Sequence, residues 1–84
     1  DLIALGVLKA CQDLGRRVPE DVAVIGFDDI FYCEYCSPTL SSVHIPKFEL
    51  GQLAAESLLA QINNEDVQSG QVVVPELILR ESTP

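Results

Sequence analysis

Apolar residues recur at helical spacing in two segments of the chain. Residues 2–14 contain no proline and lie between Asp1, a candidate N-cap, and Gly15, which suits the left-handed position after a helix. Pro46 stands where a second helix begins, and the apolar residues of 47–62 fall on one face. The pattern therefore predicts two long helices.

The first helix is expected to carry apolar residues on two sides. Four residues lie within about 40° of one another on a helical wheel and are the predicted core stripe: Ile3, Val7, Ala10 and Leu14. Three leucines spread over the opposite side: Leu2, Leu5 and Leu8. A helix of this kind needs a partner on each side.

Short apolar runs between the helices predict strands. Residues 22–27 are continuous and β-branched, which is typical of a strand covered on both faces in a parallel sheet. Further strands are expected over 40–45, 72–74 and, loosely, 76–80, with a short helical segment over 30–36. This order predicts an α/β architecture with parallel strands, although two long helices are too few to cover both faces of such a sheet.

Composition narrows the class of protein. The chain has 84 residues, enough for one domain at most, and a net charge of −8 with only five basic side chains. That balance argues against direct contact with DNA, RNA or an anionic membrane, because each phosphate contact needs a basic residue. No apolar run reaches the ~18 residues of a membrane span, and the first residues do not resemble a signal peptide.

The cysteines suggest a cellular location, and the first residue suggests that the chain is part of a longer protein. Three cysteines, an odd number, fit free thiols in a reducing compartment, so we expect a cytoplasmic location. Asp1 stands at the first position without a methionine, so we interpret the chain as a piece of something longer.

Asp28 and Asp29 are the strongest candidates for a binding site. They follow the strand over 22–27, and open α/β sheets bind ligands beyond the carboxyl ends of their strands. Asp29 has an alternative role as the cap of the short helical segment after it. Gly26, inside the same strand, predicts a close approach of another group to the backbone. Nothing nearby in the pattern supports catalysis by the pair, and we expect no enzyme activity and no catalytic residue.

Cys33 and Cys36 have the spacing of redox and zinc sites, which Cys11 and His44 could complete. Five residues separate Cys33 from the preceding strand, and neighbouring acids would raise a thiol pKa. We therefore favour cysteines that are buried in the core or in an interface, with no metal and no cofactor. His44 is interpreted as a solvent-facing or hydrogen-bonded strand residue.

Several blocks, read together, resemble the C-terminal end of lactose-repressor-type (LacI/GalR family) transcription regulators. They cover essentially the whole chain: Asp1-x-x-Ala4-x-Gly6, Val18-Pro19-x-Asp21-Val22, Gly26-Phe27-Asp28-Asp29, Pro38-x-Leu40-Ser41-Ser42-Val43, Leu50-Gly51-x-x-Ala54 and Arg80-Glu81-Ser82-Thr83.

The resemblance implies a fragment of a periplasmic-binding-protein-like (type I) two-lobed fold with parallel sheets. Residues 1–45 and 75–84 would belong to the C-terminal lobe and residues 46–74 to the N-terminal lobe. A small effector, a sugar or a nucleobase, would bind between the lobes. Operator DNA would be contacted only through a helix-turn-helix region that is absent from this chain.

The resemblance also implies site residues. Asp28 would contact the effector, with Asp29 and Lys47 as further candidates. A homodimer would form through residues of the first helix and of the segment after Asp29: Leu5, Leu8, Lys9, Tyr32, Cys33 and Tyr35. Two alternatives stay open: an extracytoplasmic sugar-binding protein of a transport system, and a thiol or zinc module at Cys33 and Cys36.

Overall fold

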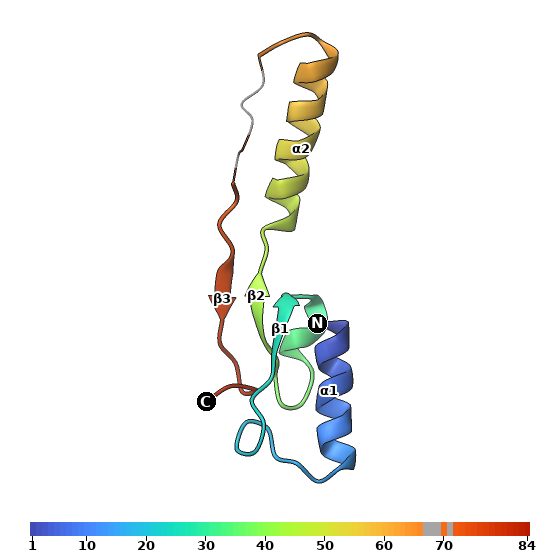
Figure 1. Ribbon diagram of the computed structural model, residues 1–84, viewed down its shortest axis with the longest axis vertical. Helices are drawn as coiled ribbons and strands as arrows, with labels where there is room; N and C mark the ends of the chain where they lie inside the picture. The colour runs from blue at the N-terminus through green and yellow to red at the C-terminus, as the bar shows by residue number, and fades with distance from the viewer. Residues whose placement is uncertain (67–69, 71) are drawn as a thin grey trace. The chain divides into compact units, whose positions relative to one another are not determined.

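The computed structural model describes residues 1–66, 70 and 72–84 (Figure 1). The chain divides into two compact units. The first joins Asp1–His44 to Glu76–Pro84, and the second is Ile45–Pro75.

The first unit opens with helix α1, Leu2–Asp13. It ends as predicted: Gly15 adopts a φ of 69°, and the amides of Gly15 and Arg16 donate to the carbonyls of Gln12 and Cys11. This pair of bonds is the Schellman arrangement that closes a helix.

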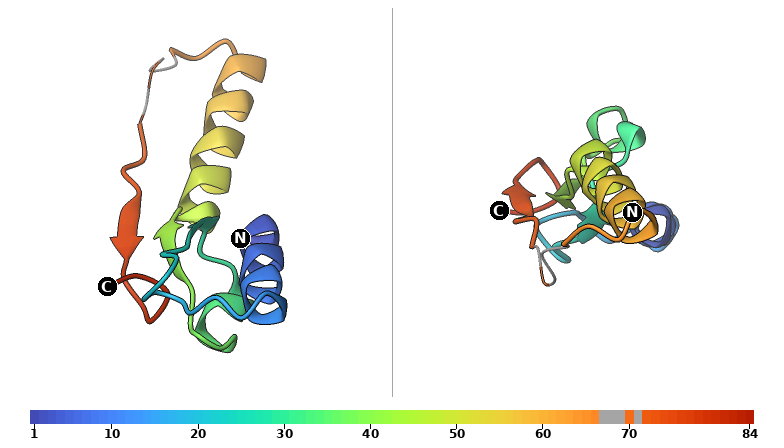
Figure 2. Two further views of the ribbon diagram at one scale, coloured as in Figure 1. Left: turned by 60° about the horizontal axis from the view of Figure 1, so that its bottom comes forward. Right: turned by 90° about the horizontal axis from the view of Figure 1, so that it is seen from above.

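The predicted core stripe of α1 was wrong. The buried residues are Ala4, Leu8 and Cys11, whereas Ile3 and Leu14 are 85% and 76% exposed. With apolar residues nearly all round the helix, periodicity could not choose the face. Small residues on the inner face let α1 approach β1, beside which it lies in Figures 1 and 2.

The described residues form a three-stranded sheet in the order β1 (Ile25–Asp28), β2 (Ser41–His44) and β3 (Glu76–Ile78). β1 and β2 are parallel, as expected, but β3 is antiparallel to β2. The chain leaves the first unit after His44 and returns at Glu76, its register partner, so β3 runs back along β2. Residues 72–74 form no strand, which corrects that prediction.

β1 is shorter than predicted and is not covered on both faces by the described residues. Val24 lies outside the strand, and both of its backbone polar groups bond to Ser82: its amide donates to the Ser82 carbonyl over 3.0 Å. The Ser82 hydroxyl donates to the Val24 carbonyl over 2.6 Å. Ile25 and Phe27 remain half exposed.

The core of the first unit lies between α1, the sheet and η1 (Phe31–Glu34), a short 3₁₀ helix within the predicted helical segment. Cys33 and Leu40 have no exposed surface, and they pack with Ala4, Leu8 and Val24. This core supports the strand ends that carry the candidate site.

The second unit contains helix α2, Lys47–Ile62, with the bounds that the sequence predicted. None of the described residues of α2 is buried, and the Phe48 side chain is 86% exposed. Within the described part of the chain, no helix is both long and apolar enough to cross a membrane.

Candidate functional site

Three titratable residues stand in register at one edge of the sheet. Asp28 of β1 pairs with His44 of β2, which pairs with Glu76 of β3. Asp28 and His44 are the last residues of two parallel strands, and ligands of α/β sheets commonly bind at such strand ends. Asp28 is an exposed residue at this edge.

The backbone at this edge is strained. Asp28 has a φ of 113° and Asp29 a φ of 55°, both in the left-handed region that favours glycine. Each residue held in such a conformation costs roughly 1–3 kcal/mol and persists only where surrounding contacts fix it, commonly at binding sites. The conformation of residues 28 and 29 therefore depends on the contacts that surround them.

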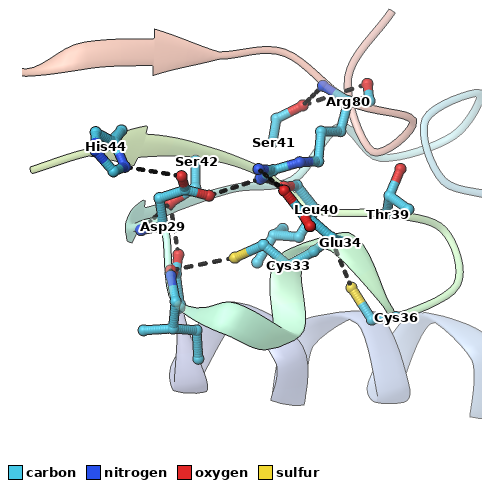
Figure 3. Close-up of polar contacts among 12 residues, drawn as sticks. Asp29, Cys33, Glu34, Cys36, Thr39, Leu40, Ser41, Ser42, His44 and Arg80 are labelled. Carbon is cyan, nitrogen blue, oxygen red and sulfur yellow. Dashed lines mark hydrogen bonds and ion pairs between the residues drawn. The ribbon is translucent and has the colours of Figure 1, made fainter.

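Asp29 is held by three residues on two segments, β2 and the C-terminal segment (Figure 3). Its carboxylate pairs with Arg80 Nη1 at 2.8 Å and with His44 Nδ1 at 2.9 Å. Its amide donates to Ser42 Oγ over 2.9 Å. Burial alone would raise the pKa of Asp29, but hydrogen bonds and charge from Arg80 and His44 outweigh it and lower that pKa.

These contacts decide between the predicted roles of Asp29 and His44. Asp29 does not cap η1, because the N-cap residue is Ile30 and no side chain makes a cap bond there. Both carboxylate oxygens of Asp29 already have partners within the chain. His44 is a hydrogen-bonded strand residue, as predicted.

Arg80 is the member of the site that sequence reasoning missed. Its guanidinium Nη1 also donates to the Leu40 carbonyl over 2.8 Å, and its amide donates to Ser41 Oγ over 2.7 Å. Its side chain is only 12% exposed. The Arg80-Glu81-Ser82-Thr83 block was visible in the sequence, but no local pattern shows that Arg80 reaches Asp29.

Asp1 occupies the N-cap position of α1, as predicted, but its side chain has a different role. It makes no side-chain cap bond to α1. Its carboxylate accepts instead from Ser42 Oγ at 2.8 Å, from the Ile30 amide at 2.7 Å and from Cys33 Sγ at 3.2 Å. A Cβ built on Gly26 would overlap Asp1 Oδ1, so the close approach predicted for Gly26 is confirmed.

The cysteines are packing residues in this structure. All three are free, and burial, followed by the nearby Asp29 charge, raises the pKa of the Cys33 thiol. Cys36 Sγ donates to the Pro38 carbonyl. No group of three or more candidate ligands among the described residues is arranged to hold a metal ion. The raised pKa argues against a reactive thiol at Cys33.

Four of the six residues predicted for a dimer interface divide into two sets. Leu8 and Cys33 pack in the chain's own core, which argues against their predicted place in a dimer interface. Tyr32 and Tyr35 are exposed on η1 and the residue after it, and both contact the ring of Phe31.

Three further candidate residues lie elsewhere. On α1, Leu5 is partly buried, and Lys9 forms an exposed ion pair with Asp13 at 2.7 Å. Lys47 is the first residue of α2 and belongs to the second unit.

The chain is similar to known transcription regulators along its whole length. A family described as "Periplasmic binding protein-like domain" matches residues 1–83. The uncharacterised HTH-type transcriptional regulator YvdE of Bacillus subtilis is 48% identical over 84 residues, which are 99% of this chain and 27% of that protein.

Solved structures agree. A LacI family transcriptional regulator from an Arthrobacter species, in complex with lactose, has a TM-score of 0.86 and 43% identity over 100% of this chain and 33% of that one. The lac repressor dimer bound to operator and an anti-inducer has a TM-score of 0.91 and 30% identity over 99% of this chain and 29% of that one. The chain thus spans about a quarter to a third of these relatives. It belongs to the periplasmic binding protein-like family, and in its LacI-type relatives it matches part of the effector-binding core.

Proposed function

We propose that this chain is the ligand-sensing and dimerisation part of a cytoplasmic LacI-type regulator that binds a small effector through Asp28. The observation that carries the proposal is the exposed residue Asp28, which ends β1 beside the parallel strand β2 and lies on a strained backbone. A carboxylate there accepts hydrogen bonds from the hydroxyl groups of a sugar or the N–H groups of a nucleobase. The lactose-bound relative supports the sugar class.

The effector would act by shifting an equilibrium. In the proposed regulator, residues 1–45 and 75–84 belong to one lobe and residues 46–74 to the other. The division of the chain after His44 and before Glu76 agrees with this assignment. An effector that binds the closed arrangement more tightly than the open one would change the population that binds operator DNA. DNA contact itself would come from a region outside this chain.

Replacing Asp28 by alanine in the complete regulator tests the effector site. We expect affinity to fall by about 1.5–3 kcal/mol, or roughly 10- to 150-fold, because a charge-assisted hydrogen bond is lost. Calorimetry with lactose, D-ribose, hypoxanthine and guanine identifies the probe that binds and measures the change. Asp13→Ala removes an exposed carboxylate from the same unit and serves as the control. Unchanged affinity in Asp28→Ala would refute the site.

We also propose a two-fold homodimer. Its interface uses the side of α1 that carries Leu5 and Lys9, together with the aromatic cluster of Phe31, Tyr32 and Tyr35. Exposed aromatic side chains are common anchors of protein interfaces. The lac repressor, which this chain resembles, is a dimer in its operator complex.

The dimer is tested by Leu5→Asp/Tyr35→Asp in the complete regulator. Analytical ultracentrifugation should show a shift to monomer, with circular dichroism unchanged. Ala23→Asp/Gln61→Asp adds the same charge at exposed positions outside α1 and the aromatic cluster and should leave the dimer intact. A double variant that associates as tightly as the wild type would exclude this interface.

The alternatives have less support. A transport-type sugar-binding protein is not among the three relatives described above, all of which are transcription regulators. A thiol or zinc module is disfavoured by the buried Cys33, whose thiol donates to Asp1.

A further inference from the structure

Asp29 is the residue next to the proposed effector contact, and its contacts face inward. Arg80, His44 and Ser42 reach it from the C-terminal segment and from β2, within 2.8–2.9 Å (Figure 3). The side chains of Asp29 and Arg80 are 14% and 12% exposed. Asp29 is therefore fixed at its carboxylate and at its backbone amide.

Arg80 is itself held in one position. Its Nη1 donates to the Leu40 carbonyl as well as to Asp29, its Nη2 lies 3.9 Å from Glu34 Oε1, and its amide is bound to Ser41. A planar guanidinium can serve these acceptors together, whereas an ammonium group at one point cannot. Arg80 thus acts as a rigid anchor for Asp29.

The backbone before this anchor needs support. Asp28 and Asp29 are consecutive non-glycine residues with positive φ values, a conformation that reverts to ordinary regions when the surroundings do not enforce it. The direction of the Asp28 side chain depends on that φ value. Contacts to the next residue are the nearest constraint on it.

We propose that Asp29, held by Arg80 and His44, is a positioning residue of the effector site. Its contacts fix the left-handed turn at residues 28 and 29 and thereby aim the Asp28 carboxylate, without Asp29 touching the effector. The inference rests on the proposed function, because it takes Asp28 as the effector contact.

The first measurement is independent of any effector. Residue-resolved hydrogen exchange on the complete regulator follows the amides of Asp29 and Ile30, which donate to Ser42 and Asp1. In Arg80→Met we expect these amides to exchange about tenfold faster or more, because the turn opens locally. Arg17→Met breaks another Arg–Asp pair, Arg17 with Asp21 in an exposed loop, and should leave them unchanged. Unchanged exchange in Arg80→Met would overturn the proposal.

The second measurement separates positioning from plain stabilisation. Calorimetry well below the unfolding temperature uses whichever of lactose, D-ribose, hypoxanthine and guanine binds the wild type. Arg80→Met and Asp29→Asn should lose about tenfold in affinity or more, and Arg80→Lys should recover part of the loss because it keeps the charge beside Asp29. A purely structural role would lower the unfolding temperature and leave the affinity of the folded protein intact.

The outcomes distinguish the two proposals. If Asp28→Ala loses affinity and Arg80→Met does not, the positioning role is wrong and the effector site stands. If Asp28→Ala keeps its affinity, the effector site is wrong, and the exchange rates still decide whether Arg80 holds the turn. If none of the four probes binds, the exchange rates alone decide the positioning role.

Discussion

Replacing Gly26 by alanine should destabilise the protein because the Asp1 carboxylate occupies the space of the new methyl group. A Cβ at this position would overlap Asp1 Oδ1 and lie 3.1 Å from both Asp1 Cγ and Leu40 Cδ2. The leucine methyl can move aside, but the carboxylate can move only by lengthening its bonds to Ser42 and Ile30. The substitution therefore acts through those bonds.

The expected cost follows from the bonds at risk. Hydrogen bonds to charged groups contribute about 1.5–3 kcal/mol each, so losing both would cost about 3–6 kcal/mol. Partial re-formation reduces that figure, and the lower entropy of the unfolded alanine chain returns about 0.4–1 kcal/mol. We expect a net loss of about 2–3 kcal/mol, large against a total stability of about 5–15 kcal/mol.

Urea unfolding of the complete regulator, followed by circular dichroism, measures this loss. Gly6→Ala is the matched control: it lies within α1 with nothing within 4 Å of its added Cβ, and it should stabilise by about 0.5–1 kcal/mol. In an Asp1→Ala background the cost of Gly26→Ala should fall below about 0.5 kcal/mol, because the overlapping oxygen is gone. Equal costs in both backgrounds would refute the reasoning.

Three further predictions follow from the structure. The folded chain lowers the pKa of Asp29 from its ordinary value of 3.8, so the Asp29 carboxylate stabilises the fold above that pH. Urea unfolding should therefore show a stability difference between wild type and Asp29→Asn at about pH 5. That difference should vanish toward about pH 2. A difference that persists at the acid end would contradict the ion pair. Burial and the raised pKa of Cys33 should keep it unlabelled by iodoacetamide at about pH 8 in the native regulator, as read by peptide mass spectrometry; labelling as fast as in urea would show that the site opens. The isolated 84-residue chain should self-associate in sedimentation velocity, because α2 buries none of its described residues, and a monomer with cooperative unfolding would contradict this.

The sequence predicted the elements better than it predicted their faces. The bounds of α2 and the left-handed Gly15 came from local signals, a proline and a glycine at helix ends. The buried face of α1 could not be predicted from local signals. Its buried residues Ala4 and Cys11 are small and only moderately hydrophobic, whereas the exposed Ile3 is strongly hydrophobic. Hydrophobicity alone cannot show which side of a helix a partner occupies.

Only part of the candidate site could be predicted from the sequence, because local patterns do not show which distant residues meet. The place of Asp28 and Asp29 at a strand end followed from the strand pattern, and the close approach at Gly26 followed from its type. The partner of Asp29 is Arg80, which lies beyond the whole second unit in the sequence. Pairings at that separation are set by the tertiary fold, and no local pattern encodes them.

Ser82 sets the order in which the first unit can assemble during synthesis. Its hydroxyl joins Val24 across 58 positions and also accepts from the Ser41 amide, while all of the second unit is synthesised in between. β1 and β2 are able to pair early. The hydrogen bonds of Ser82 to Val24 and Ser41 can form only after the ribosome has completed the second unit. A compact second unit shortens the loop that must then be closed, whereas an unfolded one lengthens it and makes closure less favourable. The folding rate of the first unit is therefore tied to the integrity of the second.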